Sequence, residues 1–202
     1  RRRSAAATST GSMAPPDRPG TMSDAERAWR RALTVALALY TVWSLRSPDQ
    51  YHFLDAIDLP IHETGHLVFA WGGDILTALG GTLLQLIMPL AFAVYFWRRG
   101  DRHAASVPLW WTGQNCWNIA RYVADARAME LPLVGGGEHD WNYLLGEWGV
   151  LGRDTLIARD IRFFGTVLAI AAIGIGWQAL QRRDPGRVSP PPQDQGDAGL
   201  AS

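Results

Sequence analysis

The stretch LPIHETGHLVFAWGG, residues 59–73, carries two histidines and a glutamate inside an otherwise apolar segment. His62 and His66 are four residues apart, so on an α-helix they lie on one face with Cβ atoms about 5–6 Å apart. Two imidazoles at this spacing bind one metal ion, and Glu63 beside them is placed to act as a general base. The stretch therefore predicts a zinc-binding helix. The other interpretation is a helix whose histidines have buried partners of another kind.

The residues around the two histidines indicate where this helix begins and ends. Pro60 is suited to a first helical turn, because its missing N–H would be unpaired there in any case. Gly72 and Gly73 are typical of a helix end. A zinc site that activates water keeps one position open, so we expect one further protein ligand from another part of the chain.

Long apolar segments occupy most of the chain between its polar ends. A helix needs about 20 residues to span a bilayer, and the ten tryptophans belong to a residue type that favours membrane–water interfaces. The expected fold class is all-α, a polytopic membrane bundle of about four or five helices. The segments expected as helices are 32–45, 59–71, 75–97, 105–125 and 161–180.

Composition sets the domain organisation and excludes several functions. Residues 1–26 and 184–202 are polar and Pro-rich and are expected to be disordered, which leaves 27–183 as one membrane-embedded, metallopeptidase-like domain. A formal net charge of zero argues against nucleic acid as a partner. The single Cys116 excludes an intramolecular disulfide and a multi-cysteine zinc site. The serines stand in no G-x-S-x-G setting.

The positions of the arginines predict how the chain crosses the membrane. Cytoplasmic loops are enriched in arginine and lysine, and we expect an integral, multi-pass protein of the plasma (inner) membrane. His62, Asp125 and loop 126–160 then share the opposite face. His52 and His103 flank apolar segments and are expected at the surface. The arginines that define the cytoplasmic side are Arg30, Arg31, Arg98, Arg99, Arg102, Arg182 and Arg183.

A polar stripe on the segment 105–125 offers a third metal ligand. Gln114, Asn118, Arg121 and Asp125 are spaced by four, three and four residues, so they share one helical face. Such a stripe points into a membrane bundle, because ionisable groups facing lipid are costly. Asp125 is the favoured ligand, with the other three orienting substrate or polarising a carbonyl. The alternative is an Asp125–Arg121 ion pair at the helix end.

A second source of ligands lies in LPLVGGGEHDWNYLL, residues 131–145. His139 and Asp140 follow three glycines that permit unusual backbone angles, so either side chain is able to reach the metal. Glu130, Glu138 and Glu147 are further acidic candidates.

The segment 75–97 carries a row of residues suited to close helix packing. Thr77, Gly81 and Gln85 recur every four residues. Small side chains in such a row let two helices approach closely. Gln85 requires a hydrogen-bond partner across that interface.

Three parts of the chain together resemble the site-2 protease family of intramembrane zinc metalloproteases. They are the stretch His62-Glu63-Thr64-Gly65-His66, the intervening GGTLLQLIMPL and the downstream NIARYVADA. The resemblance covers about 59–125. It implies that His62, His66 and Asp125 hold Zn²⁺ and that Glu63 is the general base of a zinc metalloendopeptidase. The substrate it implies is a membrane protein or peptide cleaved in or near the membrane.

Two other functions remain compatible with the sequence. One is a metal-binding membrane protein without peptidase activity, such as an assembly factor or a metal handler. The other is a structural or signalling membrane protein. The lipid bilayer is a partner in each case, and the oligomeric state is left open.

Overall fold

The computed structural model describes residues 22–132 and 138–181, and this part of the chain is all-α. The predicted fold class is therefore confirmed at the level of helical content. The α-helices are α1 (Asp24–Arg46), α2 (Asp55–Phe69), α3 (Gly73–Arg98), α4 (Arg102–Ala124), α5 (Asp140–Glu147) and α6 (Asp154–Gln181). Short 3₁₀ turns, η1 (Ala70–Gly72) and η2 (Leu151–Arg153), precede α3 and α6.

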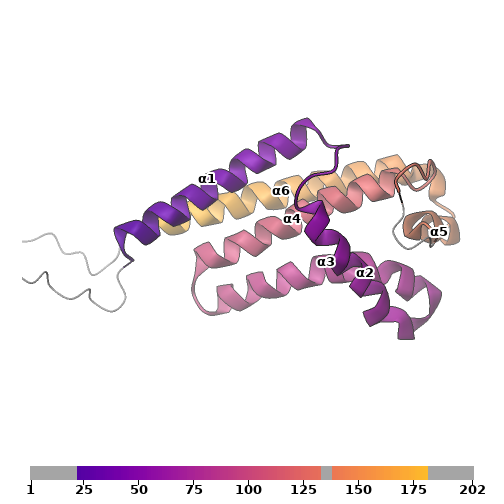
Figure 1. Ribbon diagram of the computed structural model, residues 1–202, viewed down its shortest axis with the longest axis horizontal. Helices are drawn as coiled ribbons and strands as arrows, with labels where there is room; N and C mark the ends of the chain where they lie inside the picture. The colour runs from indigo at the N-terminus through magenta and orange to yellow at the C-terminus, as the bar shows by residue number, and fades with distance from the viewer. Residues whose placement is uncertain (1–21, 133–137, 182–202) are drawn as a thin grey trace, which may run out of the picture.

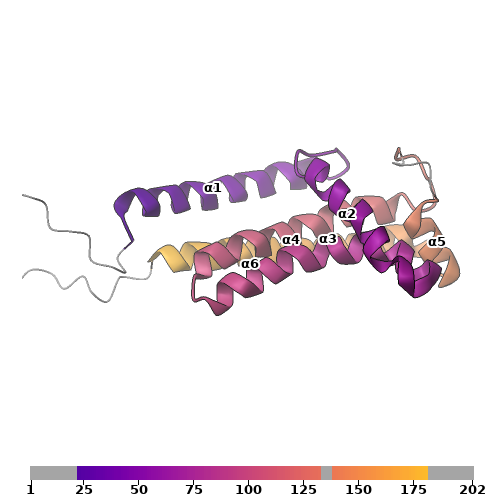
Figure 2. The same ribbon diagram turned by 60° about the horizontal axis from the view of Figure 1, so that its bottom comes forward.

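The centre of the molecule is formed by α4 and α6, which run side by side (Figure 1). They approach closely at Gly113 and Gly165, where a Cβ added to either glycine would lie within 2.7 Å of the other's carbonyl oxygen. Figure 2 shows α3 beside this pair and α1 along another side. The α1 helix is held there by Thr41, whose hydroxyl accepts a 2.8 Å hydrogen bond from the Trp110 indole.

The shorter helices α2 and α5 lie at the end of the bundle that is remote from both chain termini (Figures 1 and 2). α5 is positioned by Trp141, Leu144 and Leu145, which are buried against α4 and the start of α6. The sequence analysis treated 126–160 as a loop and did not predict this helix. It lies at the same end of the bundle as α2, and the predicted shared membrane face stays a prediction.

Several helix boundaries differ from the prediction. α2 begins at Asp55 rather than near 59, because the buried Asp55 carboxylate accepts a 2.8 Å hydrogen bond from the His52 N–H. Pro60 thus lies inside the helix, on its exposed face, and not in the first turn. α1 begins at Asp24, so its first three residues belong to the helix and not to a disordered segment 1–26. Residues 1–21 and 182–202 lie outside the described residues.

Two helical stretches in the described part of the chain are long and apolar enough to cross a membrane. They are Asp55–Arg98, which runs through α2, η1 and α3, and Leu151–Gln181, which is essentially α6. This finding rests on length and composition and supports an association with a membrane.

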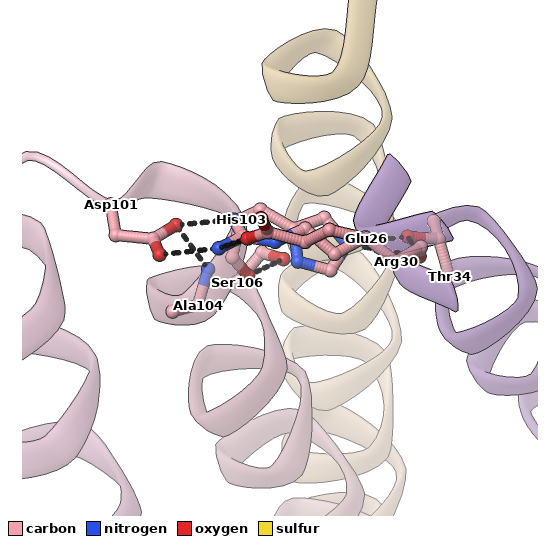
Figure 3. A network of polar contacts seen from close by, with 7 residues as sticks. All are labelled: Glu26, Arg30, Thr34, Asp101, His103, Ala104 and Ser106. Atoms are coloured by element: carbon pink, nitrogen blue, oxygen red, sulfur yellow. Dashed lines mark hydrogen bonds and ion pairs between the residues drawn. The ribbon is translucent and has the colours of Figure 1, made fainter. Parts of the chain in front are cut away.

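At the end near the termini, α1 is joined to the start of α4 by a polar network (Figure 3). The Arg30 guanidinium donates two hydrogen bonds to Asp101, at 2.8 and 2.9 Å. His103 Nε2 lies 3.0 Å from both the Thr34 hydroxyl and the Arg30 carbonyl oxygen.

His103 is buried, as is His52 near Trp43. The prediction that both histidines lie at the surface was wrong, because each ring has a polar partner that offsets the free-energy cost of burying it.

The crossing of α2 and α3 depends on two glycines, Gly65 and Gly80. A Cβ on Gly65 would overlap the Gly80 carbonyl group, and one on Gly80 would meet Gly65 in return. We expect Gly65→Ala to lower the free energy of unfolding by about 3 kcal/mol, because neither backbone has room to yield. The control is Gly174→Ala on α6, where a Cβ meets nothing within 4 Å. Thermal unfolding of the detergent-solubilised variants measures both, and equal melting temperatures would contradict this packing.

Candidate metal centre

Three acceptor groups from two helices converge at the α2–α5 end of the bundle. His62 and His66 project from one face of α2, and Asp140 is the first residue of α5. Asp140 Oδ2 lies 3.1 Å from His62 Nε2 and 3.4 Å from His66 Nε2. The three ligand atoms all lie within 4.8 Å of one another, so the group could hold a metal ion.

The other nitrogen of each ring is bound to α3, which fixes the orientation of both imidazoles. His66 Nδ1 donates to the Thr77 backbone carbonyl at 2.8 Å, and a carbonyl oxygen only accepts. His62 Nδ1 donates to Gln85 Oε1 at 3.1 Å. With Nδ1 engaged in this way, Nε2 is the atom of each ring that faces Asp140. It donates to the carboxylate when it carries a proton, and it offers a lone pair to a metal ion when that proton is displaced. This is the arrangement that metal-ligating histidines adopt.

Gln85 is itself held by a partner on α4. Its Nε2 donates a 2.9 Å hydrogen bond to Asn118 Oδ1. The predicted hydrogen-bond partner across the helix interface is therefore confirmed, and Asn118 supports His62 through Gln85.

Asp140 is oriented by Tyr122 on α4. The Tyr122 hydroxyl accepts the Asp140 backbone N–H at 3.2 Å and donates to Asp140 Oδ2 at 3.3 Å. Burial raises the pKa of Asp140, but hydrogen bonds from His62 and His66 outweigh it and bring the pKa down to about 2. The carboxylate is therefore ionised and available as a ligand.

Asp125, the ligand favoured by the sequence, is turned away from the two histidines. It caps the end of α4, and its carboxylate accepts the backbone N–H groups of Glu130 and Leu131 at 2.9 and 3.0 Å. Its Oδ2 also lies 3.4 Å from His139 Nε2. Asp125 and His139 thus hold the turn between α4 and α5, because the chain reverses directly after Asp125. The structure brings Asp140 to the histidines instead.

The other residues of the polar stripe either bind Asp55 or line the cavity described below. Gln114 is buried and donates to Asp55 at 3.2 Å, away from the histidines. Arg121 forms a 3.3 Å ion pair with Asp55 and donates to the Gln50 carbonyl at 2.7 Å. The alternative Asp125–Arg121 ion pair is therefore replaced by Arg121–Asp55. Substrate contact remains a prediction for Asn118 and Arg121, which line the cavity.

A cavity of about 920 Å³ opens over the three convergent groups. Glu63 lines it together with His62, His66 and Asp140, so a further carboxylate and the candidate metal ligands face one space. Glu138 also lines this cavity, unlike the other acidic candidates Glu130 and Glu147. This arrangement is able to bind a metal ion and a peptide-sized ligand and to move a proton between them.

The sequence analysis missed two parts of the site. The first is Tyr122, which follows Arg121 in the polar stripe and was read only as part of an apolar helix. The second is the Thr77 backbone carbonyl, which no side-chain pattern reveals. Gly81 was assigned to close packing, and it does lie directly against the His62 ring.

Comparison of the chain with protein-family models, with curated proteins and with solved structures found no match. The fold and site by themselves define the class: a helical protein with two candidate membrane spans and a candidate His-His-Asp metal centre.

Gln85→Leu tests the support of His62 without removing a ligand. Loss of the hydrogen bond to Nδ1 frees the ring, and we expect metal affinity to fall about 10- to 100-fold. Competition with a chromogenic chelator measures the affinity. Gln178→Leu is the matched control, because Gln178 is exposed near the far end of α6. Equal affinities in the two variants would contradict a positioning role for Gln85.

Proposed function

We propose that the protein is a membrane-embedded zinc metallopeptidase that hydrolyses peptide bonds in or near the membrane. The observation that carries this proposal is the convergence of His62 Nε2, His66 Nε2 and Asp140 Oδ2 on one point. Both Nδ1 atoms are bound to α3, so the two Nε2 atoms and the Asp140 carboxylate share one point. A metal ion at this point replaces the Nε2 protons that otherwise bridge to the carboxylate.

The donor set favours zinc among divalent metals. Imidazole and carboxylate are both common zinc ligands, and three protein ligands leave the fourth position that catalytic zinc sites keep open. Ligand atoms at about 2.1 Å from a tetrahedral zinc ion are roughly 3.4 Å apart. The distances from Asp140 Oδ2 to the two histidines, 3.1 and 3.4 Å, agree with that spacing.

The residues of the chain fit the roles of peptide hydrolysis. A zinc ion supplies Lewis-acid activation of water and of the scissile carbonyl. Glu63 accepts the proton of the attacking water and delivers it to the leaving amine. Arg121 and Asn118, which line the cavity from α4, donate hydrogen bonds to the substrate backbone. Tyr122 holds Asp140 in place throughout.

The proposed protein is inserted in the inner membrane as a multi-pass protein, and its apolar surface supports contact with lipid. Helices α1, α3 and α6 carry many exposed apolar side chains, which include Leu39, Phe92 and Ile170. Exposed tryptophans stand near the helix ends, as in membrane–water interfaces. The resemblance to site-2 proteases then extends to the chemistry, with Asp140 taking the place that the resemblance gives to Asp125.

Zinc stoichiometry tests the ligand set. We expect about one zinc per wild-type chain by elemental mass spectrometry, because three ligands suffice for a catalytic site. Asp140→Ala removes one ligand and should abolish stoichiometric zinc. Asp125→Ala, the matched control, should keep it. Zinc lost with Asp125→Ala and kept with Asp140→Ala would contradict the proposed site, as would a folded wild-type protein without metal.

A further inference from the structure

The exposed side chains of α6 change from charged to apolar along the helix. Arg159 and Asp160, near its start, have side chains that are 72% and 63% exposed. Phe163 and Phe164 follow, at 63% and 68% exposed, and apolar exposure continues as far as Trp177. Because exposed charges are costly in lipid, a bilayer around this helix ends between Asp160 and Phe163. The first turns of α6 therefore lie in water.

A second marker of depth is the group of exposed tryptophans at the end near the termini. Trp29 lies in the second turn of α1, Trp97 is the last residue but one of α3, and Trp177 lies near the end of α6. These three helix ends are neighbours in Figure 1, and the Arg30–Asp101 pair in Figure 3 joins two of them. Tryptophan favours the membrane–water interface, so this end marks one face of the bilayer.

The thickness of a bilayer then locates its other face. A hydrocarbon core of about 30 Å corresponds to about 20 residues of helix. Counted from the three tryptophans, this length reaches Thr77 on α3, Ile157 on α6 and Asp49, just past the end of α1. On α6 the counted level lies about one turn before Asp160, where the surface begins to change from charged to apolar.

That level is the level of the metal centre. The Thr77 carbonyl binds His66, and Ile157 packs against the apolar cluster that holds α5. Asp49 lines the cavity over the ligands. The centre is therefore separated from the tryptophan end by the full thickness of the hydrocarbon.

The α2 helix has the surface of a helix that lies at such a boundary. Its buried face carries Asp55, Asp58 and His62, whereas its outer face exposes apolar side chains. This inverted arrangement places lipid outside the helix and polar groups toward the cavity. The exposed apolar residues on and beside α2 are Phe53, Ile57, Leu67, Val68 and Trp71.

We propose that the metal centre lies at the membrane–water boundary and that its substrates are surface segments of polypeptide adjoining a membrane span. This inference rests on the proposed peptidase function and names its substrate class. Peptide bonds within the hydrocarbon core are hydrogen-bonded in a helix, and opening that helix in lipid leaves polar groups unsatisfied. A segment at the surface is extended in water and enters the cavity without that cost.

Thiol labelling in proteoliposomes tests the location. Cys116 is the single cysteine of the chain, so Cys116→Ala provides the background for single-cysteine variants. We expect a membrane-impermeant maleimide, supplied on both sides of the vesicles, to label Glu138→Cys at the cavity and Arg159→Cys on α6. Ile170→Cys, in the apolar part of α6, should be labelled at least tenfold more slowly. Protection of Glu138→Cys to the level of Ile170→Cys would overturn the boundary location.

A membrane-anchored peptide tests the substrate class. The probe is an oligoleucine span with mixed-sequence flanks on both sides, co-reconstituted with the zinc-loaded protein, and cleavage positions are read by mass spectrometry. We expect cuts in the flank next to the span, and at least 100-fold fewer with Glu63→Gln. Cuts inside the span would overturn the surface class and leave the peptidase standing. No cut anywhere would overturn the peptidase function and with it the substrate class, and the labelling result would still decide the location.

Discussion

We expect replacement of Glu63 by glutamine to abolish the proposed peptide hydrolysis and to leave zinc in place. Glutamine keeps the size of the side chain but does not accept a proton, so a general-base contribution of about 10²- to 10⁴-fold is lost. The three ligand groups, His62, His66 and Asp140, are untouched. Cleavage of the membrane-anchored peptide and zinc content, measured on one preparation, check both parts of this prediction.

Glu138→Gln is the matched control, because Glu138 lines the same cavity from the segment before α5. We expect it to retain activity within a few-fold. If Glu63→Gln remains as active as wild type, another group moves the proton and the assignment of Glu63 is wrong. If the zinc-loaded wild-type protein cleaves no peptide, the chain is a metal-binding membrane protein without peptidase activity.

We expect replacement of Gly81 by alanine to weaken zinc binding although no ligand residue is substituted. A Cβ at this position would lie 2.5 Å from His62 Nε2 and 2.6 Å from its Cδ2, so the ring has to leave its place. His62 then loses its hydrogen bond to Gln85 and its alignment with Asp140. We expect zinc affinity to fall more than about 100-fold, beyond the usual effect of losing one supporting hydrogen bond. Chelator competition measures it.

Gly174→Ala controls for the general effect of alanine in a helix. A Cβ on Gly174 meets nothing within 4 Å, and we expect it to raise stability by about 0.5–1 kcal/mol and to leave zinc binding unchanged. Circular dichroism distinguishes loss of metal from loss of fold. A folded Gly81→Ala protein with wild-type zinc affinity would show that His62 is not held against α3 as the structure describes.

The sequence by itself determined the local features of this protein. The spacing of His62 and His66 placed both rings on one face, because the helical repeat fixes that relation whatever the surrounding fold. The apolar segments identified α1, α3, α4 and α6. Each of these helices is longer than its apolar segment, because backbone hydrogen bonding continues into the flanking residues. Gln85 was recognised as needing a partner because a buried amide has few alternatives.

Only the tertiary structure decided which carboxylate joins the two histidines. Asp125 and Asp140 are both acidic residues downstream of the helix that carries His62 and His66, and composition and spacing do not separate them. The difference lies in where the chain turns: Asp125 satisfies the backbone N–H groups that follow α4. Asp140 begins α5, which the burial of Trp141, Leu144 and Leu145 docks beside α2. Contacts between residues far apart in the chain set that docking, and a local pattern carries no information about them.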